Sequence, residues 1–171
     1  MSEIHLTSFI AAPIERVFDL SRSINLHQIS TIETYEKAIH GVLNGLINKN
    51  ETVTWQAKHL FKTRQFTTKI TEMQSPDFFI DVMTRGDFKF FYHEHHFKSV
   101  KNGTIMIDVI KFESPYGFIG KIVEVHSATL NLAIGCKQRF RLCKYLYNLR
   151  NGINTSKLRR SCKERFIIAK V

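Results

Sequence analysis

Apolar and polar residues follow two different periods along the first 113 residues of the chain. A short run rich in β-forming residues, Ile4 to Ala11, predicts a strand that ends at Ala12-Pro13. A helical period follows and predicts a helix from Pro13 to about Ser21 and a second from about Ile24 to Thr31. From residue 35 onward the period becomes two and predicts six further strands, near residues 35–41, 51–61, 64–73, 78–84, 88–100 and 104–113.

The last two of these strands form a predicted hairpin. Asn102-Gly103 supplies the two positive φ angles of a type I′ turn, which would place Lys101 opposite Thr104. In this register the cross-strand pairs are Ser99/Met106, Phe97/Asp108, His95/Ile110 and His93/Phe112.

One face of this hairpin is predicted to point inward. The pair Glu94/Lys111 suits a solvated face, so the opposite face carries the core side chains. Those are Phe91, His93, His95, Phe97, Met106, Asp108, Ile110 and Phe112. Two imidazoles and a carboxylate among apolar neighbours need partners, so this face either holds a closed hydrogen-bonded network or lines a cavity that admits water or ligand.

A long C-terminal helix is the expected cover for that face. Ser114 and Pro115 suit its first turn, and Gly152 offers a C-cap after Arg150-Asn151. We therefore expect an α+β protein in which a curved antiparallel sheet of about seven strands wraps around this helix. The domain would span residues 1–150 and be followed by a basic tail, residues 151–171, disordered or atypical.

Four strings of sequence resemble the START-like (SRPBCC, polyketide cyclase/dehydrase, pollen-allergen-like) helix-grip superfamily, in particular an uncharacterised bacterial subgroup. Ala12-Pro13-Ile14-Glu15-Arg16-Val17-Phe18-Asp19-Leu20 resembles its AP-x-E-x-VFDL start, and Glu51-Thr52-Val53-Thr54-Trp55-Gln56-Ala57-Lys58-His59 resembles its ETVTW-x-A-x-H strand. Two further strings, Phe91 to His95 and Asp108 to Gly117, resemble later stretches. The four occur in order with compatible spacing, and the match as a whole covers about residues 4–123.

The resemblance implies a pocket between sheet and helix that in relatives holds lipids, sterols, polyketides or similar molecules. That superfamily contains carriers and enzymes, so the fold leaves the activity open and no catalytic residue is transferred. The candidate pocket residues are Trp55, His59, Phe66, Phe91, His93, His95, Phe97, Met106, Asp108, Ile110 and Phe112.

The net charge of +10 is confined to the C-terminal part of the chain. Residues 1–120 carry 13 basic and 13 acidic side chains, whereas residues 121–171 carry 12 and 2. Cys136, Cys143 and Cys162 lie there too, at spacings typical of neither a disulfide framework nor a CxxC zinc site. Three explanations of this basic, cysteine-containing end remain open. They are divergence with a solvated basic surface, an altered end of the chain, and a functional patch around Leu158 to Arg165.

The leading hypothesis is a non-catalytic protein that binds a hydrophobic or amphipathic small molecule in the cavity. An aromatase/cyclase-like enzyme using His93 or His95 as acid or base, with Asp108 setting the tautomer, is the alternative. Binding of an anionic partner through the tail is a second alternative. A membrane surface is a weak possibility for that partner, and nucleic acid is not expected because no motif supports it.

The remaining expectations concern cofactors and location. His-x-His with Asp108 could complete a metal-binding set, but we expect no metal and no cofactor. No apolar run reaches the roughly 20 residues of a bilayer span and no signal sequence is evident, so we expect a soluble cytoplasmic protein. The oligomeric state stays open.

Overall fold

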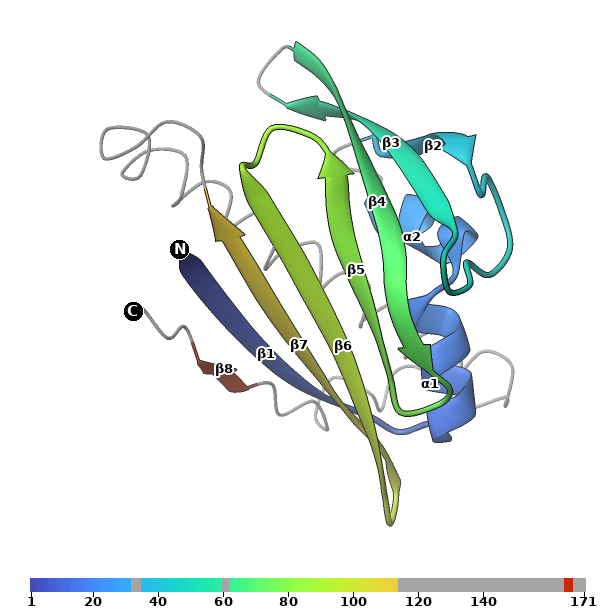
Figure 1. The fold of residues 1–171 in the computed structure, drawn as a ribbon. Coiled ribbons are helices and arrows are strands. Elements are labelled where there is room, and N and C mark those ends of the chain that lie inside the picture. Colours follow the sequence, from blue (N-terminus) through green and yellow to red (C-terminus); the bar gives the residue numbers. More distant parts are fainter. Residues whose placement is uncertain (32–34, 60–61, 114–164, 168–171) are drawn as a thin grey trace.

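The computed structural model describes residues 1–31, 35–59, 62–113 and 165–167. The chain forms an antiparallel sheet in the order β2-β3-β4-β5-β6-β7-β1-β8, with two short helices packed on one face (Figure 1). The strands are β1 (Ser2–Ile10), β2 (Lys37–Gly41), β3 (Thr52–His59), β4 (Lys62–Gln74), β5 (Phe78–Arg85), β6 (Phe90–Val100), β7 (Gly103–Glu113) and β8 (Arg165–Ile167). The helices are α1 (Ile14–Ser21) and α2 (Ile24–Ser30).

The predicted elements up to residue 113 are confirmed, with boundaries shifted by a few residues. Pro13 lies at the N-cap of α1 rather than inside its first turn, and Ser23 caps α2 by accepting a hydrogen bond from Leu26 N. The strand β8 was not predicted: three residues of the basic tail pair with β1, where Leu6 lies opposite Phe166. The remainder of that tail, the proposed helix after Pro115, the boundary at residue 150 and all three cysteines lie outside the described residues.

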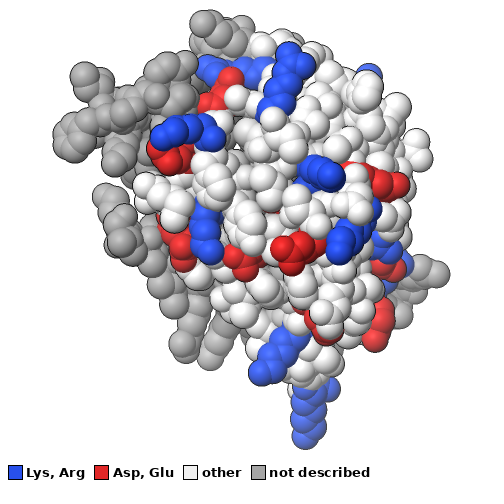
Figure 2. Space-filling view, viewed as in Figure 1, with Lys and Arg blue, Asp and Glu red and all other residues white. Residues whose placement is uncertain are grey.

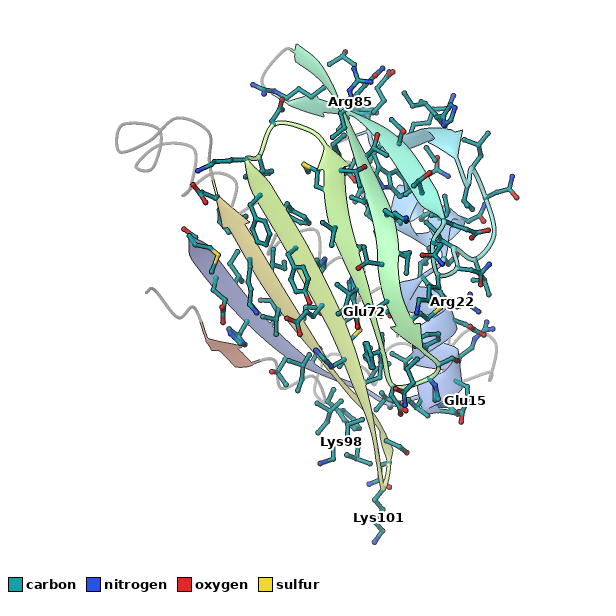
Figure 3. The ribbon with its side chains drawn as sticks, viewed as in Figure 1. Glu15, Arg22, Glu72, Arg85, Lys98 and Lys101 are labelled. Carbon is teal, nitrogen blue, oxygen red and sulfur yellow. The ribbon has the colours of Figure 1, made fainter. Side chains whose placement is uncertain are left out.

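The predicted register of the β6–β7 hairpin is wrong by two residues. The loop consists of Lys101 and Asn102, and Val100 pairs with Gly103, so Asn102-Gly103 is not the centre of the turn. The hairpin tip with Lys101 projects beyond the sheet (Figure 3). Gly103 instead lies against β1, where a Cβ would come within 2.3 Å of the Ile10 carbonyl oxygen. Close backbone packing therefore explains the glycine better than turn geometry does.

The inner face of the sheet, defined here as the face that α1 and α2 cover, holds the core. Phe18 of α1 is 1% exposed and packs edge-on against Phe79 and Phe97 at ring-centroid distances of 5.7 and 5.4 Å. Arg22, at the end of α1, donates hydrogen bonds to Asp19 Oδ1 and to the Ile47 carbonyl. These contacts hold the helices against the sheet and against the segment that precedes β3.

The outer face is polar and carries charges of both signs. Figure 2 shows Lys and Arg interspersed with Asp and Glu over the sheet surface seen in that view. Glu94 and Lys111 form an ion pair on this face, as predicted, with Lys111 Nζ 3.2 Å from Glu94 Oε1, but they are diagonal rather than directly opposite. Lys98 is exposed, as expected for that face. None of the helices in the described ranges is long and apolar enough to cross a membrane.

Candidate functional site

Four polar side chains meet in the middle of the inner face, on three adjacent strands. Asp81 comes from β5, His93 and His95 from β6 and Asp108 from β7. Asp81 pairs with His93, and Asp108 pairs with His95. Because side chains two residues apart share a face, both imidazoles point inward, with one carboxylate on each side of them. We call these four residues the His–Asp cluster.

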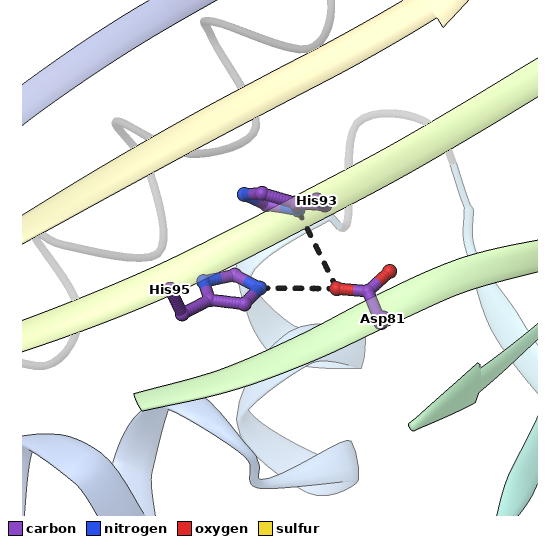
Figure 4. Close-up of side chains that lie close together, drawn as sticks. All are labelled: Asp81, His93 and His95. Carbon is purple, nitrogen blue, oxygen red and sulfur yellow. Dashed lines mark hydrogen bonds and ion pairs between the residues drawn. The ribbon is translucent and has the colours of Figure 1, made fainter. Parts of the chain in front are cut away.

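Each imidazole uses its two nitrogens toward different carboxylates. His93 Nε2 lies 3.1 Å from Asp108 Oδ1, and His93 Nδ1 lies 3.6 Å from Asp81 Oδ1. His95 Nδ1 lies 2.6 Å from Asp108 Oδ1, and His95 Nε2 lies 3.1 Å from Asp81 Oδ1. Figure 4 shows the two nitrogens that face Asp81. A single oxygen of each carboxylate therefore serves both rings.

The hydrogen bonding of the cluster is incomplete among the described residues. In the described part of the chain, His95 Nδ1 lies close to Asp108 Oδ1 without forming a hydrogen bond, and Asp108 Oδ2 has no hydrogen-bond partner. Both atoms are buried, since His95 is 2% exposed and Asp108 is 1% exposed. Unsatisfied buried polar atoms are uncommon in folded proteins and call for a physical reason.

The electrostatics of the cluster separate the two histidines. Burial lowers the pKa of His93, and the neighbouring His95 lowers it further, so this ring is neutral at pH 7. Burial also acts to lower the pKa of His95, but the charge of Asp108 beside Nδ1 and the hydrogen bond and charge of Asp81 at Nε2 outweigh it and raise that pKa. Burial acts to raise the pKa of Asp108, yet the two imidazoles hold it well below the usual range, so the carboxylate stays ionised.

Aromatic and aliphatic side chains surround the cluster. The ring of Phe79 stacks on His95 at 4.2 Å, and Phe91 lies edge-on to His93 at 6.3 Å. The buried apolar residues form two groups. One includes the α1 and β3 core and contains Val17, Phe18, Val53, Trp55, Phe79, Phe97 and Met106, among others. The other consists of Ile4, Leu6, Phe91, Ile110 and Phe112. On β6 and β7 the His–Asp cluster falls between them.

The structure brings together most of the predicted site residues. Those on β6 and β7 all point inward and are buried: Phe91, His93, His95, Phe97, Met106, Asp108, Ile110 and Phe112. Trp55 is buried on β3 with its ring 4.2 Å from that of His27, and Phe66 is half-buried opposite it on β4. His59 is the last residue of β3, and its side chain lies outside the described part of the structure.

Two features of the site were not anticipated. Asp108 was expected diagonal to His95, but the corrected register places it directly opposite. Asp81 was not selected, although an acidic residue in the apolar string Phe78-Phe79-Ile80-Asp81-Val82 was a usable signal. Its place beside His93 depends on β5 lying next to β6 in the sheet.

Three of the four side chains could also hold a metal ion. One ligand atom each from Asp81, His93 and His95 lies within 4.8 Å of the others. The set is two imidazoles and a carboxylate, a combination found in zinc and non-haem iron sites. This differs from the combination considered from the sequence, in which Asp108 supplied the carboxylate.

Comparison with known proteins gives the fold and nothing finer. No family model and no curated protein matches the chain. Among solved structures, TTHA0849 from Thermus thermophilus has a TM-score of 0.66 at 16% identity, covering 82% of this chain and 96% of that one. Ara h 8.0201 has a TM-score of 0.62 at 13% identity, covering 87% and 98%. An uncharacterised protein from Rhizobium leguminosarum has a TM-score of 0.64 at 14% identity, covering 84% of this chain and 95% of that one. These likenesses show that the chain has a helix-grip, Bet v 1-like fold.

Proposed function

We propose that this protein binds a hydrophobic or amphipathic small molecule at the inner face of the sheet, with the His–Asp cluster contacting the polar group of that molecule. The observation that carries the proposal is a charged and incompletely hydrogen-bonded cluster surrounded by aromatic and aliphatic side chains. Ligand sites typically combine apolar walls with a few converging polar groups. The likeness to Ara h 8.0201 fits binding of this general kind.

The physical cost of the cluster supports a binding role over a purely structural one. Taking charged groups out of water is unfavourable, and a buried ion pair stabilises a fold no better than well-packed apolar residues in many cases. Apolar residues at these four positions would join the two apolar groups into one continuous core. The presence of two carboxylates and two imidazoles at these positions is easier to understand if they bind a ligand.

The charge of the cluster indicates which polar group a ligand should carry. Two carboxylates face two imidazoles, and burial keeps His93 neutral by lowering its pKa. No Lys or Arg is among the buried residues that the structure describes. Among the described residues, Asp108 Oδ2 has no hydrogen-bond partner, and a carboxylate oxygen is an acceptor. A hydroxyl or amine that donates a hydrogen bond therefore suits the cluster better than a carboxylate.

A displacement assay tests the proposal. Nile red, a neutral dye that fluoresces in apolar surroundings, is added to lipid-stripped protein and then displaced with decanol or with decanoate. We expect saturable dye binding and displacement by decanol at lower concentration than by decanoate. Phe91→Leu on the inner face should weaken binding, whereas Phe90→Leu, at an exposed neighbouring position, should not. Absence of saturable dye binding by the folded wild type, or an equal effect of the two substitutions, would overturn the proposal.

General acid–base catalysis is a second candidate function, favoured by the contacts of Asp108. A carboxylate that lies against a ring nitrogen can fix the tautomer of the imidazole and stabilise its charged form. In that case His95, whose pKa is raised, would donate or accept a proton at Nε2, where a substrate would have to replace Asp81. Turnover of a polyketide-like carbonyl compound that is lost in His95→Gln while Nile red still binds would support this function. Turnover unchanged by that substitution would exclude His95.

A further inference from the structure

We propose that Asp81, His93 and His95 bind a divalent transition-metal ion, and that Asp108 orients the two imidazoles from the opposite side. The proposal concerns the same cluster as the proposed function but does not depend on a hydrophobic ligand being bound. It rests on the positions of individual donor atoms, on the role of Asp108 and on the charge of the cluster.

Two of the three separations between the donor atoms match those of metal ligands, and all three are within 4.8 Å. His95 Nε2 and His93 Nδ1 lie 3.1 and 3.6 Å from Asp81 Oδ1. Tetrahedral zinc has bonds of about 2.0–2.1 Å to nitrogen and oxygen, which places neighbouring donors about 3.3 Å apart. The two observed separations fall on either side of that value. These two donor pairs would need to move only a few tenths of an ångström to admit an ion, and the proton between His95 Nε2 and Asp81 Oδ1 would be released to solvent.

Asp108 contacts the two nitrogens that an ion would leave free. His93 would coordinate through Nδ1, and its Nε2 would donate to Asp108. His95 would coordinate through Nε2, and its Nδ1 faces the same carboxylate oxygen at 2.6 Å. Metal-binding histidines usually donate their second N–H to a carboxylate or carbonyl, which fixes the ring and the tautomer. One buried carboxylate here lies against the second nitrogen of both rings and accepts a hydrogen bond from His93, an arrangement that a structural hydrogen-bond network does not require.

The charge and donor types indicate the class of ion. Imidazoles that coordinate a metal are neutral, so in the metal-bound cluster the two carboxylates contribute two negative charges, which a divalent cation balances. Imidazole nitrogen favours zinc, iron, cobalt or nickel, whereas magnesium and calcium prefer oxygen ligands. Three protein ligands leave at least one coordination position for water or for a ligand's oxygen. The side chains of Asp81 and His93 are 16% and 11% exposed, more than the other two, and mark the accessible side of the cluster.

Metal binding is tested directly on the untagged full-length chain after treatment with a chelator. Zn²⁺ is titrated calorimetrically, and Co²⁺ is titrated while the visible spectrum is recorded. The cysteines outside the described residues could bind either ion, so the cobalt spectrum also serves to detect thiolate ligands. Asp81→Asn and His95→Gln remove a ligand each, Asp108→Asn removes the carboxylate that orients the rings, and circular dichroism establishes which variants fold.

His96→Gln is the matched control for these variants. His96 is adjacent to His95 on β6 and also contacts a carboxylate, Glu94 at 2.7 Å, but it lies on the outer face. We expect about one ion per wild-type chain and tetrahedral cobalt bands without thiolate absorption. Binding should be lost in the two ligand variants, weakened about 10–100-fold in Asp108→Asn and unchanged in His96→Gln.

Nitrogen NMR of the wild-type imidazoles makes the test independent of whether the variants fold. Addition of Zn²⁺ should shift His93 Nδ1 and His95 Nε2 and leave His96 unchanged. The proposal would be overturned if the wild type showed no saturable ion binding or if the cobalt spectrum showed thiolate bands. It would also be overturned if folded Asp81→Asn still bound the ion or if the NMR shifts were confined to His96. Any of these results would leave the Nile red assay unaffected, so failure of the metal site and failure of the proposed function are distinguishable.

Discussion

The substitution Asp108→Asn removes the charge that the two imidazoles share while preserving the shape of the side chain. Asp108 is 1% exposed, and one of its oxygens lies 3.1 Å from His93 Nε2 and 2.6 Å from His95 Nδ1. An amide at this position accepts one hydrogen bond but cannot balance a charge on His95. The metal-free protein is therefore expected to become less stable.

The size of the loss follows from the burial of the pair. Removing one partner of a buried ion pair costs about 3–5 kcal/mol, because the other charge is left without compensation. Asparagine should regain about 1 kcal/mol through a neutral hydrogen bond. We therefore expect the free energy of unfolding to fall by about 2–4 kcal/mol. With a urea dependence of about 2 kcal/mol per molar, the midpoint should drop by about 1–2 M.

Urea unfolding in the presence of a chelator measures this difference, and Thr104→Val provides a control on the same strand. Thr104 is equally buried, and its hydroxyl donates a neutral hydrogen bond of 2.8 Å to the Ala12 carbonyl. Its loss should cost about 1 kcal/mol. A midpoint for Asp108→Asn that is no lower than that of Thr104→Val would refute the ionised, partnered carboxylate on which the account of the site depends.

Three further substitutions test the fold around the site. Phe18→Ala should reduce the free energy of unfolding, measured in denaturant titrations, by about 3–5 kcal/mol, because it empties the space between α1 and the sheet. A loss below about 1 kcal/mol would contradict this packing. Gly103→Ala should reduce the free energy of unfolding by about 1–3 kcal/mol and lower the melting temperature, because the new Cβ would meet the Ile10 carbonyl. An unchanged melting temperature would be inconsistent with that close approach. Lys111→Met should change stability by less than about 1 kcal/mol, because its ion pair with Glu94 is on the outer face; a larger loss would show that this face is covered.

The sequence predicted the faces of the sheet better than the register of its strands. The β6–β7 pairing was displaced by two residues, yet His93, His95 and Asp108 were still placed on the buried face. A displacement of two leaves every side chain on its own face, because the side-chain period of a strand is also two. The register itself depended on the turn, where the packing of Gly103 against β1 was not visible in the sequence.

The candidate site was predicted in part for a related reason. His-x-His and Asp108 are recognisable as polar residues in an apolar pattern, and the hairpin brings them together locally. Asp81 reaches the same point through the lateral order of the strands and through the register of β5 against β6. Local periodicity carries no information on either feature. Because Asp81 was not predicted, the sequence could not show that one carboxylate, Asp81, lies on the more exposed side of the cluster and the other, Asp108, on the buried side.

Methyl NMR of the isoleucines during a titration with decanol tests most directly whether the inner face binds a ligand. Ile4 and Ile110 lie on that face beside the His–Asp cluster, whereas Ile107 lies on the outer face of β7. We predict that the Ile4 and Ile110 methyl signals shift together and saturate, while the Ile107 signal stays in place. Signals that do not saturate, or equal shifts on the two faces, would contradict the account.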